Sequence, residues 1–249
     1  DLTITGRMHL KGRSDPNLTK EIRFDTATFE MAGDVTWETV VGNEPMADPL
    51  VLLNGATIAI SGTGNTYTDV GGGVNIEGNG NFIVNNQTGS ATGTGNTLWI
   101  GPNVTMSGDG DVSGSTFINR GGTVSPGNSI GDLEVGDTTF EAGSTLEIEL
   151  AGNGVGDQLI INGNFDLTNL DNLIITGDRP HGDYIIATTT GLVQDEFDSV
   201  TANLSSPFVA LGGVSYTDTQ IIVSIIPEPA TLSLLGLGAV SLFRRRRRS

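Results

Sequence analysis

Short runs of alternating apolar and polar residues follow one another along most of the chain. In each run every second side chain is apolar. The runs lie at residues 57–60, 74–76, 82–84, 97–100, 104–106, 116–118, 133–135, 145–150, 158–162 and 172–176. Gly, Asn or Asp residues bound them, as in Gly78-Asn79-Gly80 and Gly108-Asp109-Gly110. A period of two predicts β-strands, and the bounding residues predict turns. No convincing helical period precedes Ile226.

Such short strands with such frequent turns predict an all-β fold, a right-handed parallel β-helix or solenoid. In that fold each coil buries aliphatic residues against its neighbours. The spacing fits coils of roughly 20 residues without a strict repeat. A β-sandwich or jelly roll is the alternative, because it also contains short alternating strands. Asparagines at the turns suit left-handed corners or side-chain ladders between coils. They include Asn54, Asn65, Asn79 and Asn128.

The pattern divides the chain into four parts. Residues 51–178 form the predicted solenoid, and residues 1–50 form either N-terminal coils or a cap. Residues 179–226 contain fuller strands, which predict a β cap over the open end of the solenoid, where unpaired edges would invite aggregation. Those strands lie at 183–187, 208–211, 214–216 and 220–226. Residues 227–249 differ in composition and form a separate tail.

Charge restricts the partners of the body. The formal net charge of the chain is −17, and the 226 residues before the tail carry −21, because the tail holds five arginines and one glutamate. Phosphates would be repelled, so nucleic-acid binding is excluded, whereas divalent cations or basic surfaces would be attracted. The chain starts at Asp1 rather than at a methionine. We therefore expect a mature chain or a fragment whose export signal has been removed.

Residues suited to catalysis are scarce. The chain has no cysteine, which excludes disulfides, thiolate metal sites and a cysteine nucleophile. His9 and His181 lie far apart, and no phosphate-binding glycine loop occurs. Trp37 and Trp99 could stack on sugars, but in a chain with so few aromatic residues we interpret them as core or cap residues.

Paired carboxylates offer a weak alternative chemistry. Asp109 and Asp111 are two residues apart, so in an extended segment both project from one face and could approach a calcium ion. Further acids follow at Asp132, Glu134 and Asp137. Turn chemistry alone also explains Asp beside Gly. Glu147 and Glu149 alternate with aliphatic residues and mark a solvated face of a strand.

Three elements follow one another in the tail. Pro227-Glu228-Pro229 precede an uncharged apolar run at residues 230–243, and five arginines follow it directly. A helix of about 14 residues spans roughly 21 Å, which is short against a hydrocarbon core of about 30 Å. Arginines resist entry into the bilayer and can extend a short span by snorkelling. The tail thus predicts a short transmembrane helix with residues 1–226 outside and the C-terminus in the cytoplasm.

Ile-Pro-Glu-Pro, the leucine-rich segment and the arginine cluster resemble the PEP-CTERM sorting signal of bacterial exported proteins. The resemblance implies recognition by an exosortase, a membrane-embedded transpeptidase, and processing during delivery to the cell surface or matrix. In this sequence the recognition motif would be Pro227, Glu228 and Pro229, and residues 230–243 would form the spanning segment. The basic stop would consist of Arg244, Arg245, Arg246, Arg247 and Arg248. Both a stable span and a transient one before cleavage fit the short apolar run.

A second resemblance lies within the body. Gly122-Thr-Val-Ser-Pro-Gly-Asn-Ser-Ile-Gly131 is similar to the repeat of autotransporter passenger β-helices. The pattern continues through residues 143–150 and 156–159. The resemblance implies a β-solenoid on the cell surface, but no chemistry, because such passengers serve as adhesins, scaffolds and enzymes alike.

These features predict an exported structural or adhesive protein of the cell surface or biofilm matrix. We expect it to have no catalytic activity and no cofactor, and its expected partners are an exosortase, the membrane and exopolysaccharide. Two alternatives remain. The protein could be a carbohydrate- or calcium-binding component of the exopolysaccharide, or a polysaccharide lyase or hydrolase.

Overall fold

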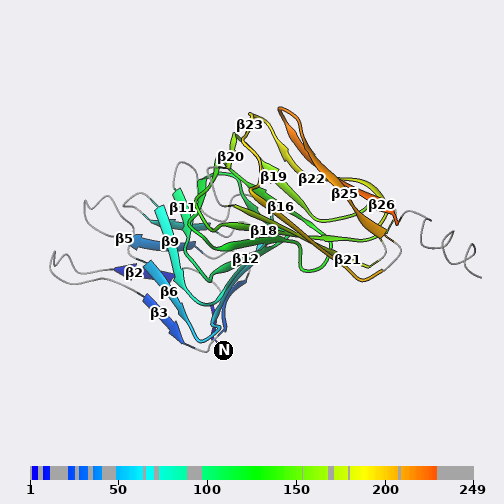
Figure 1. Ribbon diagram of the computed structural model, residues 1–249. Coiled ribbons are helices and arrows are strands. Elements are labelled where there is room, and N and C mark those ends of the chain that lie inside the picture. The colour runs from blue at the N-terminus through cyan, green and yellow to red at the C-terminus, as the bar shows by residue number, and fades with distance from the viewer. Residues whose placement is uncertain are drawn as a thin grey trace, which may run out of the picture.

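Figure 1 shows the computed structural model of the chain, in which strands stack side by side along one direction. The structure describes residues 2–4, 8–11, 22–25, 28–32, 36–40, 49–63, 66–69, 73–88, 97–152, 154–167, 171–178, 180–206 and 209–228. Within these ranges the chain is all-β and contains no helix. The all-β prediction is confirmed for these ranges.

The described strands form four sheets. The nine-stranded sheet contains, in spatial order, β1 (Leu2–Ile4), β4 (Thr28–Ala32), β7 (Thr57–Thr63), β10 (Asn81–Thr88), β12 (Thr105–Gly108), β15 (Thr123–Pro126), β18 (Thr145–Leu150), β21 (Asn172–Gly177) and β24 (Ser199–Leu204). The eight-stranded sheet contains β3 (Ile22–Asp25), β6 (Pro49–Leu53), β9 (Gly73–Gly78), β11 (Thr97–Ile100), β14 (Thr116–Asn119), β17 (Thr138–Phe140), β20 (Phe165–Leu167) and β23 (Val193–Gln194).

Two smaller sheets complete the set. The six-stranded sheet contains β13 (Asp111–Val112), β16 (Asp132–Val135), β19 (Gln158–Ile161), β22 (Gly182–Thr189), β26 (Gln220–Pro227) and β25 (Val209–Tyr216). The three-stranded sheet contains β2 (Met8–Lys11), β5 (Thr36–Val40) and β8 (Thr66–Asp69). From β1 to β25, strands that follow one another along the chain belong to different sheets, so the backbone passes through the sheets in turn and returns one strand further on.

Parallel pairing between successive coils defines the solenoid. Thr105 of β12 pairs with Thr123 of β15, which pairs with Thr145 of β18. A β-sandwich is built mainly of antiparallel strands, so the solenoid prediction is confirmed and the sandwich alternative is wrong. Coil length is uneven, because register partners lie 18 residues apart for Thr105 and Thr123 but 27 apart for Asn172 and Ser199. The right-handed sense of the coil stays a prediction.

Inward-facing residues stack in register from coil to coil. Burial alternates along the strands, and one continuous ladder of side chains, each at most 2% exposed, runs through the nine-stranded sheet. Its members are Ile58, Phe82, Met106, Val124, Leu146 and Leu173. Burying one such side chain stabilises the folded state by about 1.5–3 kcal/mol relative to leaving it in water. The strands form because this alternation gives each coil one apolar face to stack on the next.

Phenylalanines form a second column inside the eight-stranded sheet. Phe140 packs edge-on against Phe117, with ring centroids 6.5 Å apart, and against Phe165 at 5.1 Å. Phe197, which follows β23, also contacts both Phe140 and Phe165 in edge-on geometry. Edge-to-face pairs of this kind each contribute about 0.5–1.5 kcal/mol beyond the buried area. The column therefore ties the last coils of the solenoid together.

The C-terminal end of the body closes with antiparallel strands. β22 pairs in parallel with β19 on one side and antiparallel with β26 on the other. β26 then pairs antiparallel with β25. The predicted cap boundary at residue 179 falls between β21 and β22, and the other predicted domain boundaries likewise stay predictions.

Asparagines occupy left-handed corners and also make side-chain contacts between coils, which are the two roles predicted for them. Asn54 adopts a left-handed conformation with φ of 52°, and its backbone N–H donates to Oδ1 of Asn79 in the next coil at 2.9 Å. Asn128 Nδ2 donates to Asn85 Oδ1 at 2.9 Å. Asn103, with φ of 63°, is a further left-handed corner that the sequence analysis did not single out. Asn65 lies outside the described residues.

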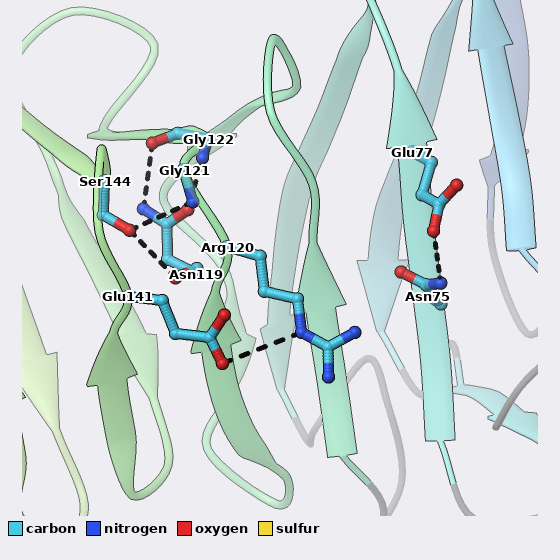
Figure 2. Close-up of polar contacts among 8 residues, drawn as sticks. All are labelled: Asn75, Glu77, Asn119, Arg120, Gly121, Gly122, Glu141 and Ser144. Atoms are coloured by element: carbon cyan, nitrogen blue, oxygen red, sulfur yellow. Dashed lines mark hydrogen bonds and ion pairs between the residues drawn. The ribbon is translucent and has the colours of Figure 1, made fainter. Parts of the chain in front are cut away.

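A buried polar corner joins β14 to the following coil (Figure 2). Asn119 is fully buried, and its side chain both accepts from the N–H of Gly122 at 2.7 Å and donates to the carbonyl of Gly122 at 3.0 Å. Ser144 Oγ donates to the carbonyl of Asn119 at 2.8 Å and accepts from the N–H of Gly121 at 3.2 Å. A buried amide without a hydrogen-bond partner destabilises the folded state. This network pairs the buried polar groups of the turn, so the turn can be buried between neighbouring coils.

Glycine is required where one coil passes close to the next. Gly108 has φ of +115°, and a Cβ built on it would lie 2.0 Å from the carbonyl oxygen of Val84. Such an approach leaves no room for a methyl group, and the backbone conformation disfavours other residues as well.

Replacing Gly108 with alanine should destabilise the body by roughly 2–5 kcal/mol, from backbone strain and steric overlap together. Gly152→Ala is the matched control, because a Cβ on Gly152 meets no atom within 4 Å. Chemical denaturation of the two variants measures the difference. Equal stability of the two variants would contradict the close packing of the coils.

Candidate functional site

The C-terminal motif begins on the last strand of the body. Pro227 is the final residue of β26 and lies opposite Val209 of β25. Ile225 of the same strand is buried, whereas Ile226, Pro227 and Glu228 are exposed. The motif thus starts where burial ends, and its first two residues are accessible to a partner.

The rest of the tail lies outside the described residues. This holds for Pro229, for the apolar residues 230–243 and for the arginines 244–248. Within the described ranges, the structure contains no helix with the length and apolarity needed to cross a bilayer. The predicted transmembrane helix and basic stop stay predictions.

A polar groove of about 300 Å³ lies on the outer face of the nine-stranded sheet. Outward-facing side chains of β12, β15 and β18 line it, among them Ser107, Ser125, Glu147 and Glu149. The loop after β15, residues 127–131, is called the groove loop below, and its residues Gly127, Asn128 and Ser129 line another side of the groove. The groove therefore combines hydroxyl groups, carboxylates and backbone groups.

Hydrogen bonds to neighbouring coils hold the groove loop in place. Gly127 and Gly108 exchange two backbone hydrogen bonds, at 2.7 and 3.1 Å. Asn128 of the loop donates its side-chain N–H to Asn85 on β10. These contacts fix the loop before any ligand arrives.

Asp157 anchors the other end of the groove loop. Its side chain is 2% exposed, Oδ1 accepts from the N–H of Gly131 at 2.9 Å, and Oδ2 accepts from the N–H of Glu149 at 2.7 Å. Burial raises the pKa of Asp157 to about 7, the two backbone hydrogen bonds partly oppose the rise, and repulsion from Glu149 and Asp132 adds to it. This carboxyl joins the loop to β18.

Asp157 is not among the site residues that the sequence predicts. Its only signal was its place in the segment 156–159, which continues the second resemblance. Gly131 lies 26 residues before Asp157 in the chain, so no local sequence pattern predicts this contact.

The acid pair considered for calcium lies at the start of β13. Asp109 is exposed in a turn, whereas Asp111 lies on β13 and its Oδ1 accepts from the N–H of Ser113 at 2.6 Å. In register, Asp111 lies opposite Glu134 of the neighbouring strand. The described residues contain no group of three or more His, Cys, Asp or Glu side chains that could hold a metal ion. Calcium binding stays a prediction.

Two of the other predicted acids join neighbouring coils. Asp137 Oδ1 accepts from the N–H of Asn164 at 2.6 Å. Glu134 accepts a hydrogen bond from the side chain of Asn162. Asp132 is exposed on β16. Asp137 and Glu134 thus hold the solenoid together.

Histidine and tryptophan show no catalytic arrangement where the structure describes them. His181 is exposed, and only its backbone contacts Tyr184, at 2.9 Å from N–H to the hydroxyl. Trp99 is not in the core, contrary to expectation, but half-buried on the outward side of β11. The side chains of His9 and Trp37 lie outside what the structure describes.

Trp99 belongs to a small polar surface cluster on the eight-stranded sheet. The Arg120 guanidinium lies 5.2 Å from the centre of the Trp99 ring, and Arg120 Nε is 3.9 Å from Glu141 Oε1. Asn75 donates to Glu77 on the same face at 2.8 Å (Figure 2). Because Arg120 covers the ring and pairs with Glu141, Trp99 contributes to stability through a cation–π contact.

Comparison with known proteins explains the tail. Residues 226–248 match the family model of the PEP-CTERM protein-sorting motif. The chain carries a PEP-CTERM sorting signal. A PEP-CTERM signal implies an exported protein associated with the cell envelope and processed by exosortase-type machinery. The match begins at Ile226, the first exposed residue at the end of β26, so the PEP-CTERM signal and the folded body adjoin without a spacer.

One curated relative matches a larger part of the chain. An extracellular serine protease of Serratia marcescens is 33% identical over 150 residues, which cover 55% of this chain and 14% of the relative. The chain thus corresponds to a small part of that protein. The likeness does not assign protease activity to this chain.

The pKa of Asp157 predicts a pH dependence of stability. Its folded value of about 7 exceeds the ordinary 3.8, so between about pH 4 and about pH 7 the folded state holds a proton that the unfolded state has lost. The protonated carboxyl of Asp157 therefore stabilises the folded state. Its contribution is fully present below about pH 4 and is lost as the pH rises through 7, and the free energy lost is at most about 4 kcal/mol.

Thermal unfolding at pH 5 and pH 8 should show this loss in the wild type and a smaller loss in Asp157→Asn, whose side chain does not titrate. Asp178→Asn, at an exposed position, is the matched control and should behave as the wild type. Identical pH dependence in wild type and Asp157→Asn would refute the assignment.

Proposed function

We propose that this chain is a structural or adhesive protein of the bacterial cell surface or extracellular matrix, delivered there by its PEP-CTERM signal. The observation that supports it most is the match at residues 226–248, which starts at exposed residues directly after a buried strand. A processing enzyme could reach Pro227 and Glu228 without unfolding the body.

The proposed route begins with export of residues 1–226 across the membrane. The apolar residues 230–243 then enter the bilayer, and the arginines 244–248 hold the C-terminus in the cytoplasm. Because a helix of about 14 residues is shorter than the hydrocarbon core, the anchor is transient and ends with cleavage.

The proposed role of the body is mechanical display, without catalysis. Three acids of the body hold its backbone in place: Asp111 supports a turn, and Asp137 and Asp157 accept backbone hydrogen bonds from residues 27 and 26 positions away. A solenoid stacked in this way is long and rigid, which suits a scaffold or an adhesin. Binding of carbohydrate is the second candidate function, and the groove on the nine-stranded sheet favours it.

Substituting alanine for both Pro227 and Glu228 should trap the uncleaved full-length chain in the membrane fraction of a host that has an exosortase. The reason is that the exposed start of the recognition motif is lost while the apolar segment is intact. Immunoblotting of membrane, surface and medium fractions measures the outcome.

Pro102→Ala/Glu196→Ala provides the matched control, because it removes the same residue types from exposed positions of the body. This control should be processed as the wild type. Normal release of the motif variant would refute sorting through the PEP-CTERM signal.

A further inference from the structure

The polar groove on the nine-stranded sheet has the features of a ligand site. Its volume of about 300 Å³ is at the small end of the range for pockets that hold small molecules. Register pairing places Ser107 beside Ser125, and Glu149 beside Thr176 on β21. Polar side chains from four neighbouring strands therefore line one hollow, at the regular strand spacing of about 4.8 Å.

The groove is preorganised by the contacts of the groove loop. Gly127 is bonded to Gly108, Asn128 to Asn85 and Gly131 to Asp157, so the loop is tied to three different neighbours. A ligand that enters does not have to order the loop first, which lowers the entropy cost of binding.

Several groups in the groove have hydrogen-bonding capacity left over. Among the described residues, the side chains of Ser107, Ser125 and Glu147 have no intramolecular hydrogen-bond partner. A serine hydroxyl can donate and accept, whereas a carboxylate can only accept. Together they match a ligand with many hydroxyl groups, each of which can also donate and accept.

Charge selects among such ligands. Glu147 and Glu149 lie on the same face of β18, and the chain as a whole carries a net charge of −17. A ligand with carboxylate or sulfate groups would be repelled at the groove, whereas hydroxyl or ammonium groups would bind to the carboxylates.

We propose that this groove binds a short stretch of polysaccharide whose sugars carry hydroxyl or amino groups and no acid group. The inference rests on the proposed surface location, because the chain would meet such polymers outside the cell. It deepens the proposed function by naming the class of matrix component to which the solenoid attaches.

Isothermal titration of the full-length chain with three hexasaccharides tests the proposal. The probes are a β-linked glucose hexamer, a glucosamine hexamer and a galacturonic acid hexamer. We expect the glucose or the glucosamine hexamer to bind at least tenfold more tightly than the galacturonic acid hexamer. Absence of binding by both non-acidic probes, or tighter binding by the acidic probe, would overturn the proposal.

Two variants locate the binding to the groove. Ser125→Tyr fills the groove from an outward-facing position and should weaken binding at least tenfold. Thr201→Tyr places the same side chain at an exposed position of β24, outside the groove lining, and should bind as the wild type. Equal binding by the two variants would place the glycan elsewhere and overturn the assignment.

A charge variant separates the two sugar classes. Glu147→Gln/Glu149→Gln keeps the shape of the groove and removes both charges. The variant should weaken binding of the glucosamine hexamer selectively if ammonium groups bind to the carboxylates. It should leave binding of the glucose hexamer unchanged if hydroxyl groups suffice. In both cases the discrimination against the galacturonic acid hexamer should shrink, and unchanged discrimination would contradict the role given to the carboxylates.

Sorting and glycan binding can fail independently. Ser125→Tyr should be processed and released as the wild type, because its tail is intact. Normal release combined with binding equal to that of the wild type refutes the groove proposal alone. Failed processing of the wild-type chain refutes the sorting route while the titration still reports on the groove.

Discussion

In-register stacking of side chains between parallel coils is the interaction on which the rest of this structure depends. Ladders such as the one that runs from Ile58 to Leu173, together with the phenylalanine column around Phe140, bury the apolar face of each coil against the next. A coil on its own has no such partner, so its strands are stable only within the stack. The polar corner at Asn119 and the close approach at Gly108 serve the same stacking.

The same register also builds the surface. Because successive side chains alternate between inside and outside, a regular core ladder imposes an equally regular outer face. On the nine-stranded sheet this face carries the groove, and Asp157 ties the groove loop to the strand beneath it. At the far end, the antiparallel strands β26 and β25 close the stack, and Pro227 lies exposed at the start of the sorting signal. Packing thus positions both the groove and the sorting motif.

Much of this fold could be predicted from the sequence, because period-two alternation is local. The runs at 145–150 and 158–162 correspond closely to β18 and β19. Short strands such as β17 (Thr138–Phe140) and β20 (Phe165–Leu167) were missed, since three residues show no clear period. The sorting motif could be recognised in the sequence because its residues are consecutive. The role of Asp157 could not be predicted, since it depends on a contact with a residue 26 positions away.

Disulfide trapping tests the parallel register most directly, because the chain has no cysteine of its own. Thr105, Thr123 and Thr145 lie on three successive strands with their side chains outward. Cysteine pairs at 105/123 and 123/145 should oxidise readily, since neighbouring strands are about 4.8 Å apart, within the Cα range of a disulfide. The 105/145 pair, two strands apart at roughly 9.6 Å, should not. Failure of both neighbouring pairs, or equal oxidation of all three, would contradict the stacked solenoid.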